Sequence, residues 1–497
     1  MATNRSGLDR TVLTVASVVV LGAIMSILDT TIVNVALDTL GRDFHASLAS
    51  IQWVATGYLL ALATVIPLTG WASERFGAKR LWMTSVFLFV AGSALSGFAW
   101  STGTLIGFRV LQGLGGGMIM PAGQTILARA AGPQRMGRVM SIVGVPMLLG
   151  PVLGPVLGGL ILQDLSWRWI FYVNLPIGAV ALVLARRLLP ETRPNRGERL
   201  DLRGLALLSP GLALLVWGLS EVGSTGGLTA PRTLGALCVG AGLVVGFVLH
   251  ASGRGRAALL DVSLFRARSF AAAAATGILF GISIFGAMIL LPLYYQIVRH
   301  EGTLATGLLM APQGLGAATA MPIAGRLTDR LGAGRVVPFG LAIAVLGTAA
   351  YTQLGAHTSY AFLAVALYVR GVGLGSTMMP AMAAAYQTLS HDAISRATTS
   401  LNIIQRVGGS IGTALMAVVL QRRIHAELGG TGKGLAALHA ISPQAHARAA
   451  PLLAHAFSQT FWVALALTAV AFVPAVFLPM RPARSHPQEA ETAVELG

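Results

Sequence analysis

Charge and cysteine are both scarce in this sequence. Only 11% of its 497 residues are charged and 55% are hydrophobic, whereas a soluble domain carries roughly 25% charged residues. The mean hydropathy is +0.72. The one cysteine, Cys238, lies in an apolar run, so an intrachain disulfide and a cysteine metal cluster are excluded. Low charge and high hydropathy together place the chain in a lipid bilayer.

Several functional classes lack their sequence signals. The net charge of +17 comes from basic residues in short clusters, without the basic faces or interleaved aromatics of a nucleic-acid site. No metal-ligand cluster and no GxxxxGKS/T phosphate loop is present, and the glycine run 113–117 lacks the preceding strand and acidic residue of a dinucleotide site. We therefore expect no enzyme, no cofactor, no metal and no nucleic-acid partner, and no ATP-driven export by this chain.

Apolar runs of about 20 residues, the length that spans a bilayer, recur along the chain. The basic residues are concentrated in alternate connections, which places both termini in the cytoplasm. The first run is longer than the core of a signal peptide and is expected to remain as a helix. We expect the outer segment 421–455 to be a partly helical loop. Fourteen membrane helices are predicted at 11–37, 48–70, 80–100, 103–127, 138–162, 168–188, 202–220, 232–250, 268–294, 303–326, 335–354, 359–387, 397–420 and 456–480.

Two short motifs occur twice. GWASERFGAKR (70–80) is echoed by GRLTDRLGAGR (325–335), and GLGGGMIMPA (113–122) by GVGLGSTMMPA (371–381). Repeated membrane halves are typical of transporters whose site lies near the midplane between them. We therefore predict an all-α polytopic membrane protein with two six-helix halves and two inserted helices. Its predicted parts are a first half at 1–190, a linker with the inserted pair at 191–265, a second half at 266–480 and a cytoplasmic tail at 481–497.

Both copies of the first motif are interpreted as short charged loops between helices. Glycine permits a tight turn, and the charges can bridge neighbouring helix ends and so latch one conformation. An ordinary positively charged inner loop is the alternative, and the existence of a second copy weighs against it. The residues assigned to these gating loops are Gly70, Glu74, Arg75, Gly77 and Lys79, and Gly325, Asp329 and Arg330.

The segment GPVLGPVLGG (150–159) places small residues on one face of the fifth predicted helix. Its glycines recur at intervals of four, which lets a second helix approach closely. Each proline removes a backbone hydrogen bond and bends the helix, so a fixed bend that shapes the cavity or seals a proton leak is a second interpretation beside close packing. The residues concerned are Gly150, Pro151, Gly154, Pro155, Gly158 and Gly159.

One acidic residue lies deep inside a predicted membrane helix. Residues 11–28 carry no charge, and Asp29 follows them. At 1.5 Å per residue, Asp29 lies about 12 Å and Arg109 of the fourth helix about 9 Å below the outer end. A charge at the bilayer centre costs roughly 2.5–3.5 kcal/mol, so such charges usually pair. We predict that Asp29 pairs with Arg109; an Arg109 satisfied by backbone carbonyls is the alternative.

Asp29 is also predicted to couple protons to transport. A buried carboxylate changes its protonation when its cavity opens or when substrate displaces its arginine. Ser26, Thr30 and Asn34 recur beside it at intervals of four and form a polar stripe that can line an aqueous cavity. A purely structural ion pair is the alternative.

Further cavity residues are predicted from depth and chemistry. Two arginines, Arg370 and Arg406, lie inside helices of the second half without an acid at the same depth, so Gln313, Asn402 and Gln405 are the nearer candidate partners. The residues predicted to line the substrate cavity are Asn34, Tyr58, Met120, Gln313, Met378, Arg370 and Arg406.

Five ordered motifs carry a family resemblance. The segments LDTTIVNVAL, GWASERFGAKR, RVLQGLGGGMIMP, GPVLGPVLGG and WRWIFYVNLPIG resemble the signature motifs of the fourteen-helix drug:proton antiporter branch of the major facilitator superfamily. The resemblance spans essentially the whole chain and is specific for the family but not for a substrate. It implies a bacterial inner-membrane exporter that alternates between inward-open and outward-open states and exchanges cytoplasmic drug for external protons.

By motif position, the resemblance implies roles for single residues. Asp29 would be the protonation site, Arg109 the helix-four arginine, and Glu74 the acid of the gating loop, while 150–159 would be the antiporter motif. Two positions depart from the family pattern: Glu74 replaces an aspartate, and Asp38 stands where proline is usual. The second-half acids that some relatives use for dicationic substrates are absent from this sequence.

Three functions are compared. The first is a proton-coupled exporter of amphipathic compounds, cations among them, acting as a monomer on small-molecule substrates. The second is a dedicated exporter of one endogenous metabolite or antibiotic with the same machinery. The third is a non-transporting membrane receptor on a transporter scaffold, and the retained loop motifs and buried charges weigh against it.

Overall fold

The computed structural model describes residues 9–191, 199–225, 230–387, 389–428 and 443–480. Within these ranges every regular element is a helix, and no strand is present. Ten helices are long and apolar enough to cross a membrane, or eleven if one bent pair forms a single span. The predicted all-α membrane fold is therefore confirmed. The predicted tail, 481–497, lies outside the described residues.

The first half of the chain contains one sharply bent span and one short interruption within a span. The axis bends by 57° between α2 and α3 at Pro67, and α7 gives way to α8 at Val173, close to Pro176. A proline lacks the N–H that continues a helix and clashes with the preceding turn, which explains both positions. The elements are α1 (Arg10–Asp43), α2 (Leu48–Val65), α3 (Leu68–Phe76), α4 (Ala78–Gly97), α5 (Thr102–Ala131), α6 (Met136–Asp164), α7 (Trp169–Tyr172) and α8 (Asn174–Leu188).

The inserted pair and the second half follow. The last predicted helix, 456–480, was misplaced: α17 begins at Pro443 and ends at Val470, so part of the expected outer loop 421–455 is helical, and residues 429–442 lie outside the described residues. The elements are α9 (Leu202–Thr225), α10 (Pro231–Arg254), α11 (Arg268–Leu293), α12 (Thr303–Leu331), α13 (Ala333–Ala349), α14 (Tyr360–Tyr386), α15 (Ile394–Glu427), α17 (Pro443–Val470) and α18 (Phe472–Ala475).

Each copy of the first repeated motif, 70–80 and 325–335, is a helix end followed by a single glycine. The interpretation of these copies as loops was wrong. Gly70, Glu74 and Arg75 belong to α3 and Lys79 to α4, with only Gly77 between the helices; Gly325, Asp329 and Arg330 all belong to α12. Gly77 has φ 90° and its counterpart Gly332 has φ 87°, which only glycine adopts readily. The equal geometry supports the repeat. We call the end of the bundle at these two glycines the motif end.

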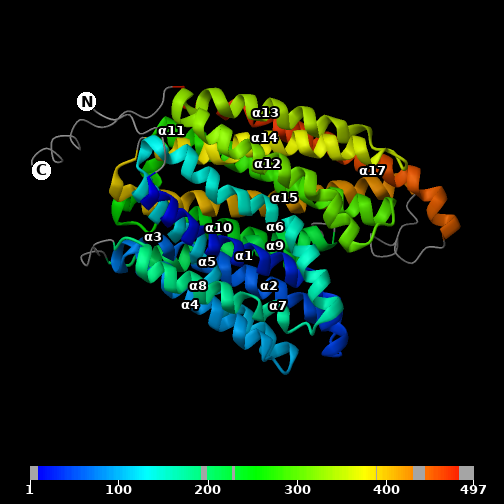
Figure 1. The fold of residues 1–497 in the computed structure, drawn as a ribbon, viewed down its shortest axis with the longest axis horizontal. Helices are drawn as coiled ribbons and strands as arrows, with labels where there is room; N and C mark the ends of the chain where they lie inside the picture. The colour runs from blue at the N-terminus through cyan, green and yellow to red at the C-terminus, as the bar shows by residue number, and fades with distance from the viewer. Residues whose placement is uncertain (1–8, 192–198, 226–229, 388, 429–442, 481–497) are drawn as a thin grey trace, which may run out of the picture.

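The hydrophobic core is shared at the motif end and divided at the other. One cluster joins both halves there and includes Val15 of α1, Ile126 of α5 and Met379 of α14. Toward the opposite end, the first half has its own cluster around Phe171 and the second half another around Phe457. In Figure 1 the helices of the two halves accordingly diverge from left to right. The halves are therefore packed together at the motif end and separate beyond it.

The inserted helices lie beside the junction of the halves. α9 packs against α2 of the first half and α15 of the second, while α10 packs mainly on α9 (Figure 1). Ser209 on α9 donates a hydrogen bond to the carbonyl of Thr64 on α2 at 2.7 Å. The pair is thus attached along one seam of the bundle and leaves the opposite seam, between α6 and α12, uncovered by it.

Candidate functional site

Asp29 is buried on α1 and enclosed by hydrogen-bond donors from α5 and α8. Arg109 Nη1 donates to Oδ2 at 2.6 Å, and Gln112 Nε2 donates to Oδ1 at 2.8 Å. Asn174 Nδ2, at the first residue of α8, also donates to Oδ1 at 3.2 Å. The carboxylate side chain has 0% exposure. The predicted ion pair of Asp29 and Arg109 is therefore present.

The Arg109 guanidinium is held from several sides. It donates from Nη1 to Gln112 Oε1 at 2.7 Å and from Nε to the carbonyl of Val54 at 3.3 Å. Its central carbon lies 4.1 Å from the centroid of the Tyr58 ring. Both environments considered for this arginine, a carboxylate and a backbone carbonyl, are thus realised, and the ring adds a cation–π contact.

Asn174 connects Asp29 to the break in the sixth span. Its Nδ2 also donates to Ser93 Oγ on α4 at 3.0 Å, and Ser93 Oγ donates to the carbonyl of Phe171 at 2.9 Å. Phe171 belongs to α7 and Asn174 to α8, so both sides of the break meet this chain of hydrogen bonds. We call Asp29, Arg109, Gln112 and Asn174 the Asp29 network.

Sequence reasoning missed Gln112, Asn174 and Ser93. Gln112 follows Arg109 by three residues, so it lies on the same face of α5, and that spacing could have identified it. Asn174 is a polar residue within an apolar run, which is a weaker signal. Nothing in the sequence singles out Ser93.

The polar stripe beside Asp29 does not face a single environment. Ser26 is buried, and its Oγ lies 3.5 Å from the hydroxyl of Tyr58. The Thr30 hydroxyl donates back to the carbonyl of Ser26 at 3.0 Å, whereas Asn34 is exposed. Only the end of the stripe near Asn34 is open to solvent.

The remaining predicted cavity residues are dispersed. Arg370 is buried and donates from Nη1 to Gln313 Oε1 at 2.8 Å, so the suggested partner is the observed one. Tyr58 is buried under Arg109, and Met120 and Arg406 are partly buried. Their assignment to a substrate cavity stays a prediction.

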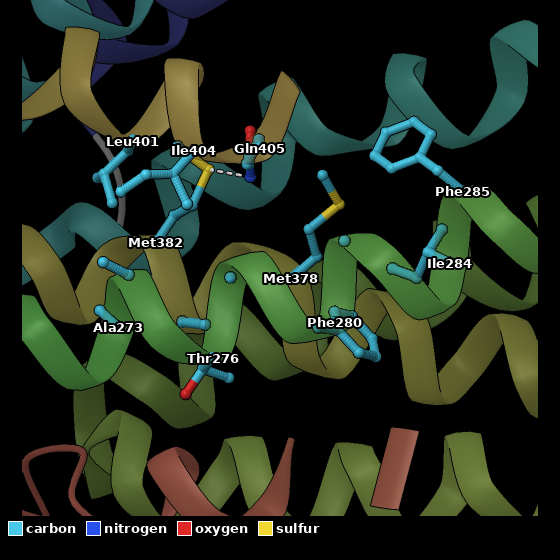
Figure 2. A pocket seen from close by; sticks show the side chains of 14 residues that line it. Ala273, Thr276, Phe280, Ile284, Phe285, Met378, Met382, Leu401, Ile404 and Gln405 are labelled. Carbon is cyan, nitrogen blue, oxygen red and sulfur yellow. Dashed lines mark hydrogen bonds between the residues drawn. The ribbon is translucent and has the colours of Figure 1, made fainter. Parts of the chain in front are cut away.

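Met378 lines a small apolar pocket between α11, α14 and α15. The pocket has a volume of about 20 Å³, room for about one water molecule. In Figure 2 the Gln405 amide, which donates to the sulfur of Met382 at 3.2 Å, is a polar group among apolar side chains such as Phe280 and Phe285. A larger apolar pocket of about 210 Å³ lies between α1 and α6 and is lined by Ile27, Leu28 and Gly150 among others.

Two salt bridges cross between the halves at the motif end. Arg396 Nη2 on α15 lies 3.1 Å from Glu74 Oε2 on α3, and Arg138 Nε on α6 lies 2.7 Å from Asp329 Oδ2 on α12. The Gly137 N–H also donates to Asp329 Oδ1 at 2.9 Å. The acid of each repeated motif therefore binds an arginine of the other half.

Close glycine contacts accompany these bridges. A Cβ at Gly137 would lie 2.7 Å from the carbonyl oxygen of Gly325, and a Cβ at Gly325 equally close to that of Gly137. A Cβ at Gly70 would lie 3.1 Å from Thr399 Oγ1. Of the other motif residues, Lys79 Nζ donates to the carbonyl of Arg186 at 3.0 Å, and Arg330 is exposed.

The glycine stripe of α6 packs against α1 next to Asp29. A Cβ at Gly150 would lie 2.0 Å from Ile27 Cγ2, and one at Gly154 2.1 Å from Thr31 Oγ1. A Cβ at Gly158 would contact Ile32 at 3.3 Å, while one at Gly159 would meet nothing within 4 Å. Close packing, the first interpretation of the stripe, is thus present at three of its glycines.

The Asp29 network binds one carboxylate on α1 to donors on two other helices. All three side chains that bind the Asp29 carboxylate are donors, which is the hydrogen bonding that an ionised carboxylate requires. Protonation would remove the charge that Arg109 pairs with and leave a buried guanidinium poorly compensated. Asp29 also lies where α1 leaves the common core and enters the separate core of the first half.

Comparison with known proteins gives a consistent result. The family model of the Major Facilitator Superfamily matches residues 19–413. The chain is 43% identical over 494 residues to the Multidrug resistance protein B homolog of Mycobacterium tuberculosis, covering 96% of this chain and 92% of that one. It is 29% identical over 407 residues to the Tetracenomycin C resistance and export protein of Streptomyces glaucescens, covering 82% of this chain and 75% of the other.

A solved structure supports the fold. The proton:xylose symporter XylE superposes with a TM-score of 0.60 at 14% identity, covering 93% of this chain and 94% of that one. With the family model matching most of the chain, these findings indicate a transporter and not an enzyme. The chain belongs to the Major Facilitator Superfamily, with relatives named for multidrug resistance, and is a multi-pass protein of the bacterial inner membrane.

Proposed function

We propose that this chain is a proton-coupled antiporter that exports drugs or other amphipathic small molecules by alternating access. The observation that carries the proposal is the Asp29 network: a buried carboxylate bound to Arg109, with donors from α5 and α8. A proton on Asp29 would weaken contacts to both helices at once, so protonation and helix rearrangement would be coupled.

The proposal includes a topology. Fourteen spans, with α2 plus α3 and α7 plus α8 each counted as one, would place both termini and the motif end in the cytoplasm. The halves, packed together at the motif end by the Glu74–Arg396 and Asp329–Arg138 bridges, would then be closed to the cytoplasm. The transporter would work as a monomer without a cofactor, driven by the proton gradient.

The proposed exporter has either a broad range of substrates or a single one. The mycobacterial relative is named for multidrug resistance, which supports a broad exporter, whereas the Streptomyces relative is named for a single compound. Efflux measured against a chemically diverse panel separates the two versions, because a dedicated exporter would show one strong substrate.

The proton-coupling role is tested by Asp29→Asn in proteoliposomes under an imposed pH gradient. Asparagine preserves the shape but cannot carry a proton, so substrate flux driven by the gradient should fall to the level of empty vesicles. Asp38→Asn is the matched control, because Asp38 lies on the same helix but is 75% exposed and pairs only with Arg42 at the surface. Gradient-driven flux as fast in Asp29→Asn as in wild type would refute the role of Asp29.

A further inference from the structure

One arginine inside a membrane helix of the second half differs from Arg109 and Arg370 in its surroundings. Arg406 lies in the middle of α15 and is partly buried. Among the described residues its guanidinium has no carboxylate within salt-bridge distance and no hydrogen-bond acceptor, whereas Arg109 has Asp29 and Arg370 has Gln313. A charge withdrawn from water without a partner is costly, so such a position is occupied by water or by an anion.

Arg406 points into the space between the halves. Asn402, one turn earlier on the same face of α15, donates to Gln124 Oε1 on α5 of the other half at 2.7 Å. Arg406 therefore lies on the face of α15 that is turned toward the first half.

The level of Arg406 is where the halves begin to separate. Ile403 of α15 belongs to the common core of the motif end, and Met416 of the same helix to the separate core of the second half. Gln405, the residue before Arg406, lines the apolar pocket that also includes Phe280, Phe285 and Met378 (Figure 2). A charged group and an apolar surface are thus adjacent at the base of the opening.

Within the part of the chain that the structure describes, no acid forms a salt bridge with Arg406. Asp29 has 0% exposure and is bound to Arg109, so it is not accessible to a cationic ligand in this state. A ligand entering between the halves would meet a guanidinium with free donors. Guanidinium groups bind carboxylate and phosphate oxygens through two parallel hydrogen bonds.

We propose that Arg406 binds the anionic group of an amphipathic substrate, a carboxylate or a comparable oxyanion, while the apolar body of that substrate lies on the surface around Met378 and Phe285. This inference rests on the proposed transport function and assigns it a substrate class, amphipathic anions. The same chemistry is present in the headgroup of an anionic phospholipid, so the test distinguishes the two sources.

The experiment compares one fluorophore in two charge states. Binding of dansyl-undecanoic acid and of its methyl ester to the full-length purified protein is titrated by fluorescence in neutral detergent, without a pH gradient. We expect the acid to bind at least tenfold more tightly than the ester. Arg406→Gln should raise the Kd of the acid at least tenfold and leave that of the ester within twofold, and Arg406→Lys should fall between. Arg422→Gln, an exposed position on the same helix, is the control.

The outcomes are distinct. Equal binding of acid and ester to wild type, or equal weakening of both by Arg406→Gln in a protein with unchanged thermal unfolding, overturns the inference. Displacement of the acid by dioctanoyl-phosphatidylglycerol, but not by dioctanoyl-phosphatidylcholine, supports the anion site and assigns it to a lipid headgroup; displacement by neither assigns it to substrate. Because no gradient is applied, a failure of proton coupling leaves this result unaffected and is seen only in the Asp29→Asn flux.

Discussion

At the scale of single residues, Asn174 has a role that Arg109 and Gln112 do not share. Its amide joins the Asp29 carboxylate to Ser93 and stands at the first residue after the break between α7 and α8. Arg109 neutralises the carboxylate, whereas Asn174 can only orient and stabilise it. Asn174 is therefore a positioning residue, and its effect should be visible in the rate of gradient-driven transport.

Replacement of Asn174 by alanine removes one neutral donor from the Asp29 carboxylate and the link from Asp29 to Ser93. One hydrogen bond is worth about 1 kcal/mol. We expect gradient-driven flux to fall several-fold, and Asn174→Gln, which keeps an amide donor, to restore part of it. Ser96→Ala is the control, because Ser96 is buried on α4 but donates only to Gly92 of its own helix. Equal loss of flux in Asn174→Ala and Asn174→Gln would show that Asn174 has only a structural role.

Some contacts of these residues could be predicted from the sequence and others could not. Asp29 and Arg109 could be paired in advance because both are charged and because helix rise alone gives their depths. Asn174 could not, since its contacts depend on how α8 packs against α4 after the interruption at Val173. Arg406 was identified as a buried charge, but its lack of a partner follows only from the packing of α15 against the first half.

At the scale of elements, α6 and α12 approach each other through two facing glycines. A Cβ at Gly325 would lie 2.5 Å from Ser141 Oγ and 2.7 Å from the carbonyl of Gly137, distances that require the helices to move apart. We predict that Gly325→Ala shifts the protein away from the state closed at the motif end. In a Cys238→Ser background, a cysteine placed at the buried Ser395 should react with a thiol reagent several-fold faster in the alanine variant.

The control for this substitution is Gly242→Ala on α10. A Cβ at Gly242 meets nothing within 4 Å, so the same loss of glycine should not change labelling at Ser395. Equal labelling rates in both variants would mean that the α6–α12 contact does not control closure.

The inserted pair α9 and α10 is anchored by one buried carboxylate. Asp201 accepts hydrogen bonds from the N–H groups of Gly204 and Leu259 at 3.0 and 3.2 Å, and pairs with His250 Nε2 at 3.0 Å. Burial raises the pKa of the Asp201 carboxyl, but these donors outweigh burial, and the net pKa lies below the ordinary value.

The sign of the stability effect follows from that lowered pKa. The folded state holds the Asp201 proton less tightly than the unfolded state, so its contribution is present above the unfolded pKa, about 3.9, and is lost as the pH falls below it. We predict that Asp201→Asn lowers the thermal unfolding temperature by a few degrees at pH 7. The difference from wild type should shrink below about pH 4, measured in detergent. Asp38→Asn, at an exposed pair, should leave the unfolding temperature unchanged both at pH 7 and below about pH 4.

The boundaries of the helices were predicted correctly where the length of an apolar run determines them. The spans of α4, α5 and α14 begin and end within a few residues of the predicted ranges, because about 20 apolar residues define them. Both copies of the first repeated motif, 70–80 and 325–335, were interpreted as loops because glycine and charge are typical of turns. Their helices continue instead to a single glycine with positive φ, Gly77 or Gly332, since one such residue suffices to reverse the chain.

At the scale of the whole molecule, the halves are held together from one end. A single core and two reciprocal salt bridges join them at the motif end, and beyond it each half has its own core. α9 packs on both α2 and α15, so it would have to slide along at least one of them if the halves moved apart in the proposed alternating access. The symmetry of the bridges, acid of one half with arginine of the other, means that neither half can tilt without straining both.

The reciprocal bridges should therefore act as one unit. Glu74→Gln removes the carboxylate of the bridge to Arg396, and Asp329→Asn removes that of the bridge to Arg138. Either change alone should weaken closure of the motif end and speed labelling of a cysteine at Ser395. Because the first opening already separates the second bridge, the double variant should add little to the faster single variant. Labelling rates that multiply in the double variant would show two independent contacts and contradict rigid-body closure. Glu427→Gln, at the opposite end of α15, should leave the rate unchanged.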